Sequence, residues 1–149
     1  MLSVDENLAC LQRFLDVVRA HNPALKLIVT VSPVPLLATG LADDTHVIAA
    51  NGHSKAVLRT AAEELRRRND GVYYFPSYEM VSYCLDDPWE EDTRHVKRTA
   101  VAQIMTAFEA AESEDSPARA EALAAWVAAH GGVNKDVILP ARSKNALPD

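Results

Sequence analysis

The stretch Leu-Lys-Leu-Ile-Val-Thr-Val, residues 25–31, decides the fold class of this chain. It is short, mostly apolar and rich in β-branched side chains, which is typical of a strand buried on both faces of a sheet. Ser-Pro-Val-Pro follows at residues 32–35, and its prolines end the strand because they cannot donate a hydrogen bond to a ladder. The sequence therefore predicts one buried strand that opens into a proline-containing loop.

On either side of this strand, the apolar pattern changes to a helical period. A capping box, Ser3 with Glu6, opens a predicted helix from about Val4 to Ala20. A second helix is predicted over residues 54–69, and Val72–Phe75 then predicts a second strand. Strand, helix and strand in this order form a βαβ unit, which places the chain in the α/β class with a short parallel sheet.

The remaining segments contribute helices and loops but no further strand. Two parallel strands make a thin sheet, so either some strands are not visible in the pattern or the sheet is completed by something outside this sequence. The assignments are a long loop at 36–51, a short helix at 78–85, an acidic loop at 86–92, a helix at 95–112, an extra C-terminal helix within 113–132 and a flexible tail at 133–149.

Composition excludes several classes of function. The chain has 149 residues, 48% hydrophobic and 24% charged, with a formal net charge of −6, which suits one soluble domain that does not bind nucleic acid. No apolar run approaches the roughly 20 residues of a membrane helix, and no signal peptide is visible, so we expect no membrane association and a cytoplasmic location. Cys10 and Cys84 lack metal-ligand spacing and are expected to be reduced thiols. No glycine-rich phosphate loop occurs, so we expect no cofactor. The histidines at 21, 46, 53 and 130 lack ligand spacing such as His-x-x-x-His, so we expect no metal.

Asp92 and His95 form the motif Asp-x-x-His, which points to acid–base chemistry. At this spacing the carboxylate can accept the imidazole Nδ1–H and leave Nε2 free as a base, as in serine hydrolases. The alternative is structural, because an Asp three residues before a His at the start of a helix can simply be an N-cap.

Ser32 and Ser77 follow the two predicted strands, where α/β folds place ligands, and are therefore candidate nucleophiles. Each is flanked by a proline, and neither lies in a Gly-x-Ser-x-Gly turn that would expose its hydroxyl. Hydrogen bonding within turns is the alternative role for both.

The ordered segments resemble the GSCFA family. The resemblance rests on Thr-Val-Ser-Pro-Val-Pro-Leu at 30–36, Ala-Asn at 50–51 with Ser-Lys-Ala-Val-Leu-Arg at 54–59, Tyr-Phe-Pro-Ser-Tyr-Glu at 74–79 and Asp-Thr-Arg-His-Val at 92–96. That family is similar to the SGNH, or GDSL-type, esterases. The resemblance implies a flavodoxin-like three-layer α/β/α fold, with His95 as the general base, Asp92 as its partner and a small acyl ester as the substrate.

The sequence departs from the family at the nucleophile. The Gly-Ser-Cys-Phe-Ala stretch that names the family is absent from this chain. The resemblance therefore implies that residues 1–112 are the C-terminal part of such a domain, without its first three strands and its nucleophile. We expect a fragment of an esterase or acyl-transfer domain that does not turn over a simple ester alone.

Two alternatives remain open at this point. The chain could be a non-catalytic binding or oligomerisation module of the same ancestry, which completes its strand edge with a partner chain or a second copy. It could also be an ordinary α/β domain in which Asp92 only caps a helix.

Overall fold

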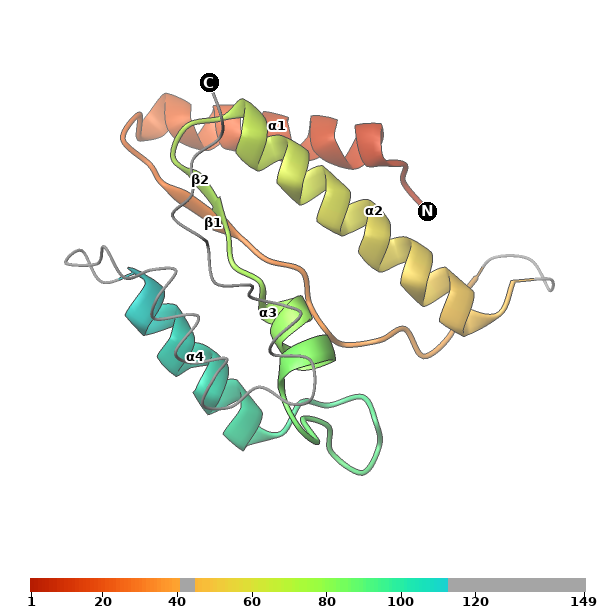
Figure 1. The fold of residues 1–149 in the computed structure, drawn as a ribbon. Helices are drawn as coiled ribbons and strands as arrows, with labels where there is room; N and C mark the ends of the chain where they lie inside the picture. Colours follow the sequence, from red (N-terminus) through yellow and green to blue (C-terminus); the bar gives the residue numbers. More distant parts are fainter. Residues whose placement is uncertain (41–44, 113–149) are drawn as a thin grey trace, which may run out of the picture. The chain divides into compact units, whose positions relative to one another are not determined.

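The computed structural model describes residues 1–40 and 45–112 (Figure 1). Contacts divide the chain into two compact units, the first being Met1–Tyr78 and the second beginning at Glu79. The elements in chain order are α1 (Val4–His21), β1 (Leu27–Val29), α2 (Val47–Arg68), β2 (Val72–Tyr74), α3 (Ser77–Glu79), the π-helical turn η1 (Met80–Cys84) and α4 (Arg98–Glu112).

A short parallel sheet organises the first unit and confirms the predicted partial α/β fold. β1 and β2 pair in parallel, with Leu27 opposite Val72 and Val29 opposite Tyr74. The 22-residue helix α2 is the crossover between them. Both strands are shorter than the sequence predicted, since regular pairing stops before the prolines.

The first helix forms as predicted. Ser3 Oγ accepts the Glu6 N–H at 3.2 Å, and Glu6 Oε2 accepts the Ser3 N–H at 2.8 Å, so both halves of the capping box are present. The helix continues to His21, one residue beyond its predicted end. The cap satisfies backbone donors that would otherwise lack partners in the first turn.

Helix α2 begins earlier than predicted, so the expected loop at 36–51 is wrong over residues 47–51. His46 is the N-cap, with its Nδ1 accepting the Ile48 N–H at 3.2 Å. Ala50 in this first turn is buried, but the larger apolar side chain of Ile48 is 73% exposed, which obscures the helical pattern that made residues 54–69 recognisable. Residues 41–44 of the expected loop lie outside the described residues.

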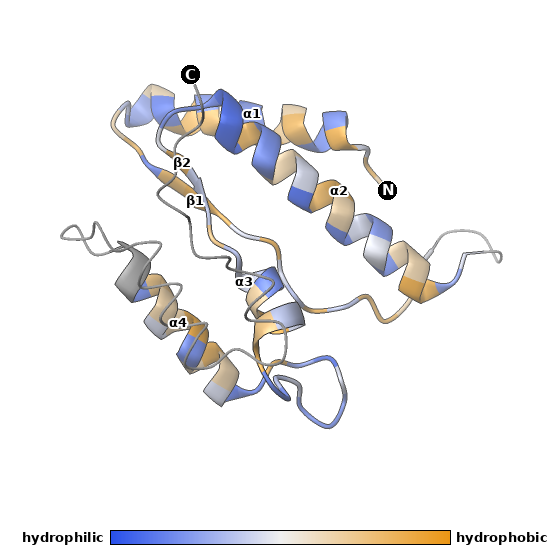
Figure 2. Cartoon of the chain, in the orientation of Figure 1, coloured by the Kyte–Doolittle hydropathy of each residue, from blue (hydrophilic) through white to orange (hydrophobic). Residues whose placement is uncertain are grey.

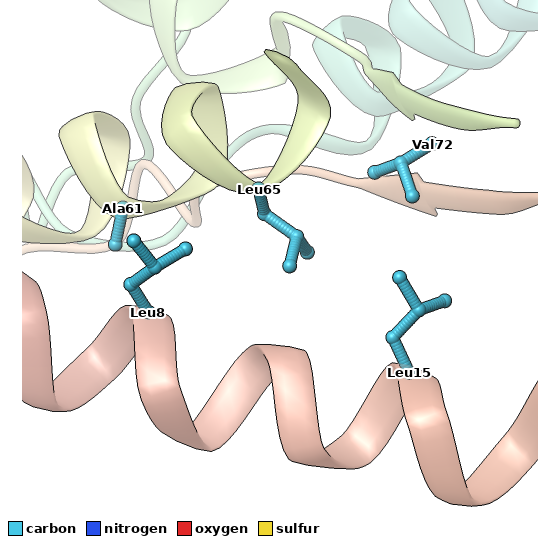
Figure 3. Close-up of a cluster of buried hydrophobic side chains, with 5 residues drawn as sticks. All are labelled: Leu8, Leu15, Ala61, Leu65 and Val72. Atoms are coloured by element: carbon cyan, nitrogen blue, oxygen red, sulfur yellow. The ribbon is translucent and has the colours of Figure 1, made fainter. Parts of the chain in front are cut away.

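The core of the first unit lies between the two long helices and one face of the sheet (Figure 3). Leu8 and Leu15 of α1 meet Ala61 and Leu65 of α2 and Val72 of β2. Partly buried apolar side chains pack around this cluster, namely Val4, Leu11, Leu25, Leu27 and Val29.

Burial of β1 differs between its two faces. Ile28 alternates with Leu27 and Val29, so it points to the other face, where its side chain is 36% exposed. The prediction of a strand buried on both faces was therefore wrong for Ile28.

The connection from α2 to β2 depends on a tight turn. Asn69 exchanges side-chain hydrogen bonds with Gln12 of α1 at 2.8 and 3.1 Å, which fixes the hydrophilic end of α2 (Figure 2). Gly71 follows with a φ of +71°, a backbone conformation that favours glycine. The guanidinium of Arg59 lies 3.8 Å from the ring centroid of Tyr74, which adds a cation–π contact between α2 and β2.

The second unit begins with a change of helix type. The Leu85 N–H bonds to the Met80 carbonyl five residues earlier at 3.1 Å, so the predicted helix at 78–85 is a short α-turn followed by a π-turn. Helix α4 starts at Arg98 rather than at the predicted His95. The predicted segments 113–132 and 133–149 lie outside the described residues. Among the described helices, none combines the length and apolarity needed to cross a bilayer.

Candidate functional site

A hydrophilic hairpin, rather than a helix, presents Asp92 and His95 (Figure 2). Trp89 and Val96 form an antiparallel bridge, and the Glu90 N–H donates to the His95 carbonyl at 2.8 Å. Asp92 therefore lies in the turn that connects the two paired segments. The prediction that a helix begins at His95 was wrong because this residue pairs across the hairpin instead.

Both carboxylate oxygens of Asp92 are engaged, each in a different task. Oδ1 accepts the backbone N–H groups of Arg94 at 3.0 Å and His95 at 2.9 Å. Oδ2 is hydrogen-bonded to Nδ1 of the His95 ring. One oxygen thus shapes the turn and the other orients the imidazole.

These hydrogen bonds favour the charged form of Asp92. The backbone N–H of His95 contributes most, followed by the His95 ring and the backbone N–H of Arg94, and together they hold the pKa of Asp92 at about 2. The carboxylate is therefore ionised at neutral pH and can only accept hydrogen bonds. Nδ1 of His95 must then carry a proton, so in the neutral ring the Nε2 lone pair is available.

The lowered pKa also sets a direction for pH dependence. A carboxyl group whose pKa is lower in the folded state stabilises that state above its ordinary pKa of 3.8. The stabilisation is lost as the pH falls from that value through about 2, where Asp92 becomes protonated. Because this group is exposed, the effect concerns the hairpin turn rather than the core.

The imidazole ring of His95 is accessible to solvent. The alternative interpretation of Asp92 as a helix N-cap is wrong. The side chain of His95 is 66% exposed and that of Asp92 is 47% exposed. Helix α4 begins six residues after Asp92, so this residue caps a hairpin turn and not a helix. The turn role and the orienting role coexist, while a catalytic role for the pair stays a prediction.

Ser32 has the turn role that was the alternative to catalysis, whereas Ser77 bonds to residues at the end of β1 rather than within its own turn. Ser32 Oγ accepts the Val34 N–H at 3.3 Å. Ser77 Oγ lies 2.6 Å from Thr30 Oγ1 and donates to the Val31 carbonyl at 3.3 Å. Both serines belong to the first unit, whereas Asp92 and His95 belong to the second.

Two polar residues of α2 contact the loop that follows β1, and these contacts were not predicted from the sequence. Lys55 is only 8% exposed, and its Nζ donates to the carbonyls of Ser32 at 2.6 Å and Val34 at 2.8 Å. Asn51 Oδ1 accepts the Leu36 N–H at 3.0 Å. Their spacing of four residues on one helix was the available signal, but the predicted helix start at residue 54 placed Asn51 in a loop.

The thiols show no sign of activation. Burial, together with the charge of Glu79, raises the pKa of the Cys84 thiol, which keeps it protonated. Cys10 is exposed on α1 as a free thiol. Within residues 1–40 and 45–112, no three His, Cys, Asp or Glu side chains gather in a way that could hold a metal ion.

Comparison with known protein families gives a match over most of the chain. Residues 1–108 match the model of the GSCFA family. No curated protein and no solved structure matches the chain. The match includes both strands, the loop at 32–36, Asp92 and His95.

Proposed function

The chain belongs to the GSCFA family, and from that premise we propose that it carries the base half of an esterase-like acyl-transfer site. The observation that carries the proposal is the hydrogen bond between Asp92 Oδ2 and His95 Nδ1, which leaves Nε2 free on an accessible ring. This is the arrangement that serine hydrolases use to activate a hydroxyl.

The proposed chemistry assigns one role to each residue. Nε2 of His95 takes the proton of a hydroxyl as its oxygen attacks the acyl carbon and the carbonyl electron pair moves to the carbonyl oxygen. When that pair returns, the bond to the leaving alcohol breaks, and His95 gives the proton to the departing oxygen. Asp92 remains ionised and stabilises the imidazolium that forms between these steps.

We place the nucleophilic hydroxyl outside these 149 residues. The Ser32 hydroxyl accepts the Val34 N–H within its own turn, and the Ser77 hydroxyl donates to the Val31 carbonyl. Neither serine lies in the Gly-x-Ser-x-Gly turn that exposes a nucleophile. A base and its orienter without a nucleophile retain little triad catalysis.

A serine-directed fluorophosphonate probe tests this proposal. The 149-residue chain is expected to remain unlabelled, because the probe reacts only with an activated hydroxyl. We use complete gene product for a protein that joins this chain to the proposed nucleophile segment. It is expected to be labelled on a serine of that segment, and His95→Ala should largely abolish that labelling. Labelling of Ser32 or Ser77, or labelling that persists in His95→Ala, would contradict the proposal, as would an unlabelled complete gene product.

Among residues 1–40 and 45–112, no strand pairs with the second edge of β1, which favours a second candidate function, association through an added strand. Leu27 and Val29 direct their backbone groups toward β2, as the bonds from Leu27 N–H to the Gly71 carbonyl and from Phe75 N–H to the Val29 carbonyl show. Ile28, which alternates with them, therefore directs its N–H and carbonyl toward the other edge. Such an edge can accept an extended segment of a partner chain or of a second copy.

Sedimentation of the chain, alone and with candidate partners, tests the second function. The wild-type chain is expected to associate, and Ile28→Pro should prevent association by removing the N–H at the open edge while leaving the β1–β2 bonds intact. Ile28→Val keeps that N–H and should associate like the wild type. A cooperative, stable monomer would argue against any need for an added strand.

A further inference from the structure

The loop that follows β1 is held by helix α2 rather than by its own contacts alone. We call residues 32–36 the strand-end loop, and Asn51 with Lys55 the α2 clamp. Lys55 Nζ reaches two carbonyls of the strand-end loop, at 2.6 and 2.8 Å, and Asn51 accepts the Leu36 N–H at 3.0 Å. The two clamp residues are one helical turn apart, so they present adjacent polar groups to the loop.

Burial of the Lys55 ammonium group at this place costs desolvation free energy. Its side chain is 8% exposed, and among the described residues no carboxylate pairs with its ammonium group. Burial lowers the pKa of Lys55, which reflects the cost of keeping the charge away from water. An apolar side chain of similar length would avoid that cost. The two carbonyl bonds offset this cost only in part, so a lysine here points to a role for the loop that these bonds hold.

The backbone conformation of the strand-end loop is restricted by its own residues as well as by the α2 clamp. Pro33 and Pro35 restrict its backbone and carry no N–H. The Val34 N–H is bonded to Ser32 Oγ and the Leu36 N–H to Asn51. The chain just before the loop is also tied, because Ser77 Oγ donates to the Val31 carbonyl.

The position of the loop in the sheet connects its restricted conformation with ligand binding. The loop leaves the carboxyl end of β1 in a parallel sheet. α/β folds bind their ligands at the carboxyl ends of parallel strands, mostly through the loops that follow them. A loop held in one conformation at that edge reduces the ordering needed when a ligand binds.

We propose that Lys55, assisted by Asn51, is a positioning residue that holds the strand-end loop in the conformation that receives the acyl substrate. The inference rests on the proposed function, because the substrate is the acyl ester of that reaction. Lys55 acts through the loop and takes no part in the proton transfer.

Lys55→Met tests the positioning role in the chain itself. The variant is expected to unfold close to the wild-type temperature, because removal of a buried charge offsets the loss of the two carbonyl bonds. Exchange of the Val34 and Leu36 amides should accelerate about tenfold as the loop loses its anchor, while exchange of the Leu65 amide stays unchanged. Lys26→Met, at an exposed lysine, is the matched control and should change neither the unfolding temperature nor the amide exchange rates.

Further variants separate positioning from support of the fold. Lys55→Arg keeps a donor group and should restore slow exchange at Val34 and Leu36 if it folds. Asn51→Ala should accelerate the Leu36 amide alone, which keeps the inference testable if Lys55→Met does not fold. A fall in unfolding temperature with faster exchange throughout the unit would overturn the inference, as would unchanged exchange in the loop.

The fluorophosphonate reaction of the complete gene product tests the link to the substrate. Lys55→Met is expected to slow labelling by about tenfold without changing which serine is labelled. An unchanged labelling rate with a loosened loop would overturn the substrate role of Lys55 and leave the proposed function standing. Absence of labelling in the wild type would instead remove the proposed function, while the exchange data would still report on the clamp.

Discussion

Leu65→Ala is expected to lower the free energy of unfolding by about 3 kcal/mol. Leu65 has no exposed surface and lies among Leu8 and Leu15 of α1 and Val72 of β2 (Figure 3). Alanine would lose the buried methyl groups and leave a cavity that close-packed neighbours fill only in part. Because domains of this size are stable by only about 5–15 kcal/mol, such a loss is a large fraction of the total.

Urea unfolding followed by circular dichroism measures this loss. Leu58→Ala is the matched control, since Leu58 is on the same helix but 39% exposed, and its replacement should cost less than about 1 kcal/mol. Equal losses at the two positions would show that the helix does not pack through the face that contains Leu65.

Asp92→Asn is expected to reverse the tautomer of His95. The amide oxygen can still accept the backbone N–H groups of Arg94 and His95, so the turn is retained. The amide nitrogen would then face Nδ1 and donate to it, which requires the ring proton to move to Nε2. A protonated Nε2 cannot accept a proton from a hydroxyl, so acyl transfer by the complete gene product should fall by ~10⁴-fold.

Nitrogen-15 shifts of the His95 ring report the tautomer in the chain itself. Asp87→Asn is the matched control, because Asp87 belongs to the same loop but pairs with Lys97 at 2.5 Å and not with the ring. Acidification of the wild type should shift the Arg94 and His95 amide signals with a midpoint near 2, where Asp92 is protonated. A tautomer that is unchanged in Asp92→Asn would show that Oδ2 does not orient the imidazole.

Features encoded by neighbours in the sequence could be predicted. The capping box at Ser3 and the contact between Asp92 and His95 each join residues three apart, so local spacing was sufficient to find them. The two strands and the βαβ order also followed from local hydrophobicity, which is why the fold class was confirmed.

Features that depend on distant residues could not be predicted. The bond from Lys55 to the Ser32 carbonyl spans 23 residues, and nothing in the local pattern marks a helical lysine as buried. The hairpin at Trp89 and Val96 was mistaken for a loop and a helix start because its short pairing carries no alternating pattern. The early start of α2 was missed since His46 is an uncommon N-cap.

The parallel register of β1 and β2 has a consequence for the order in which the first unit is assembled. Leu27 pairs with Val72, 45 positions later, so this sheet cannot nucleate as a local hairpin. On the ribosome, β1 emerges well before β2 and must wait for the whole crossover helix to follow. Closing a loop of that length costs entropy before any strand contact repays it, so we expect helix formation to precede strand pairing during synthesis. Until then α1, which packs against Leu25, Leu27 and Val29 in the folded unit, can shield the apolar segment at residues 25–31 from other nascent chains.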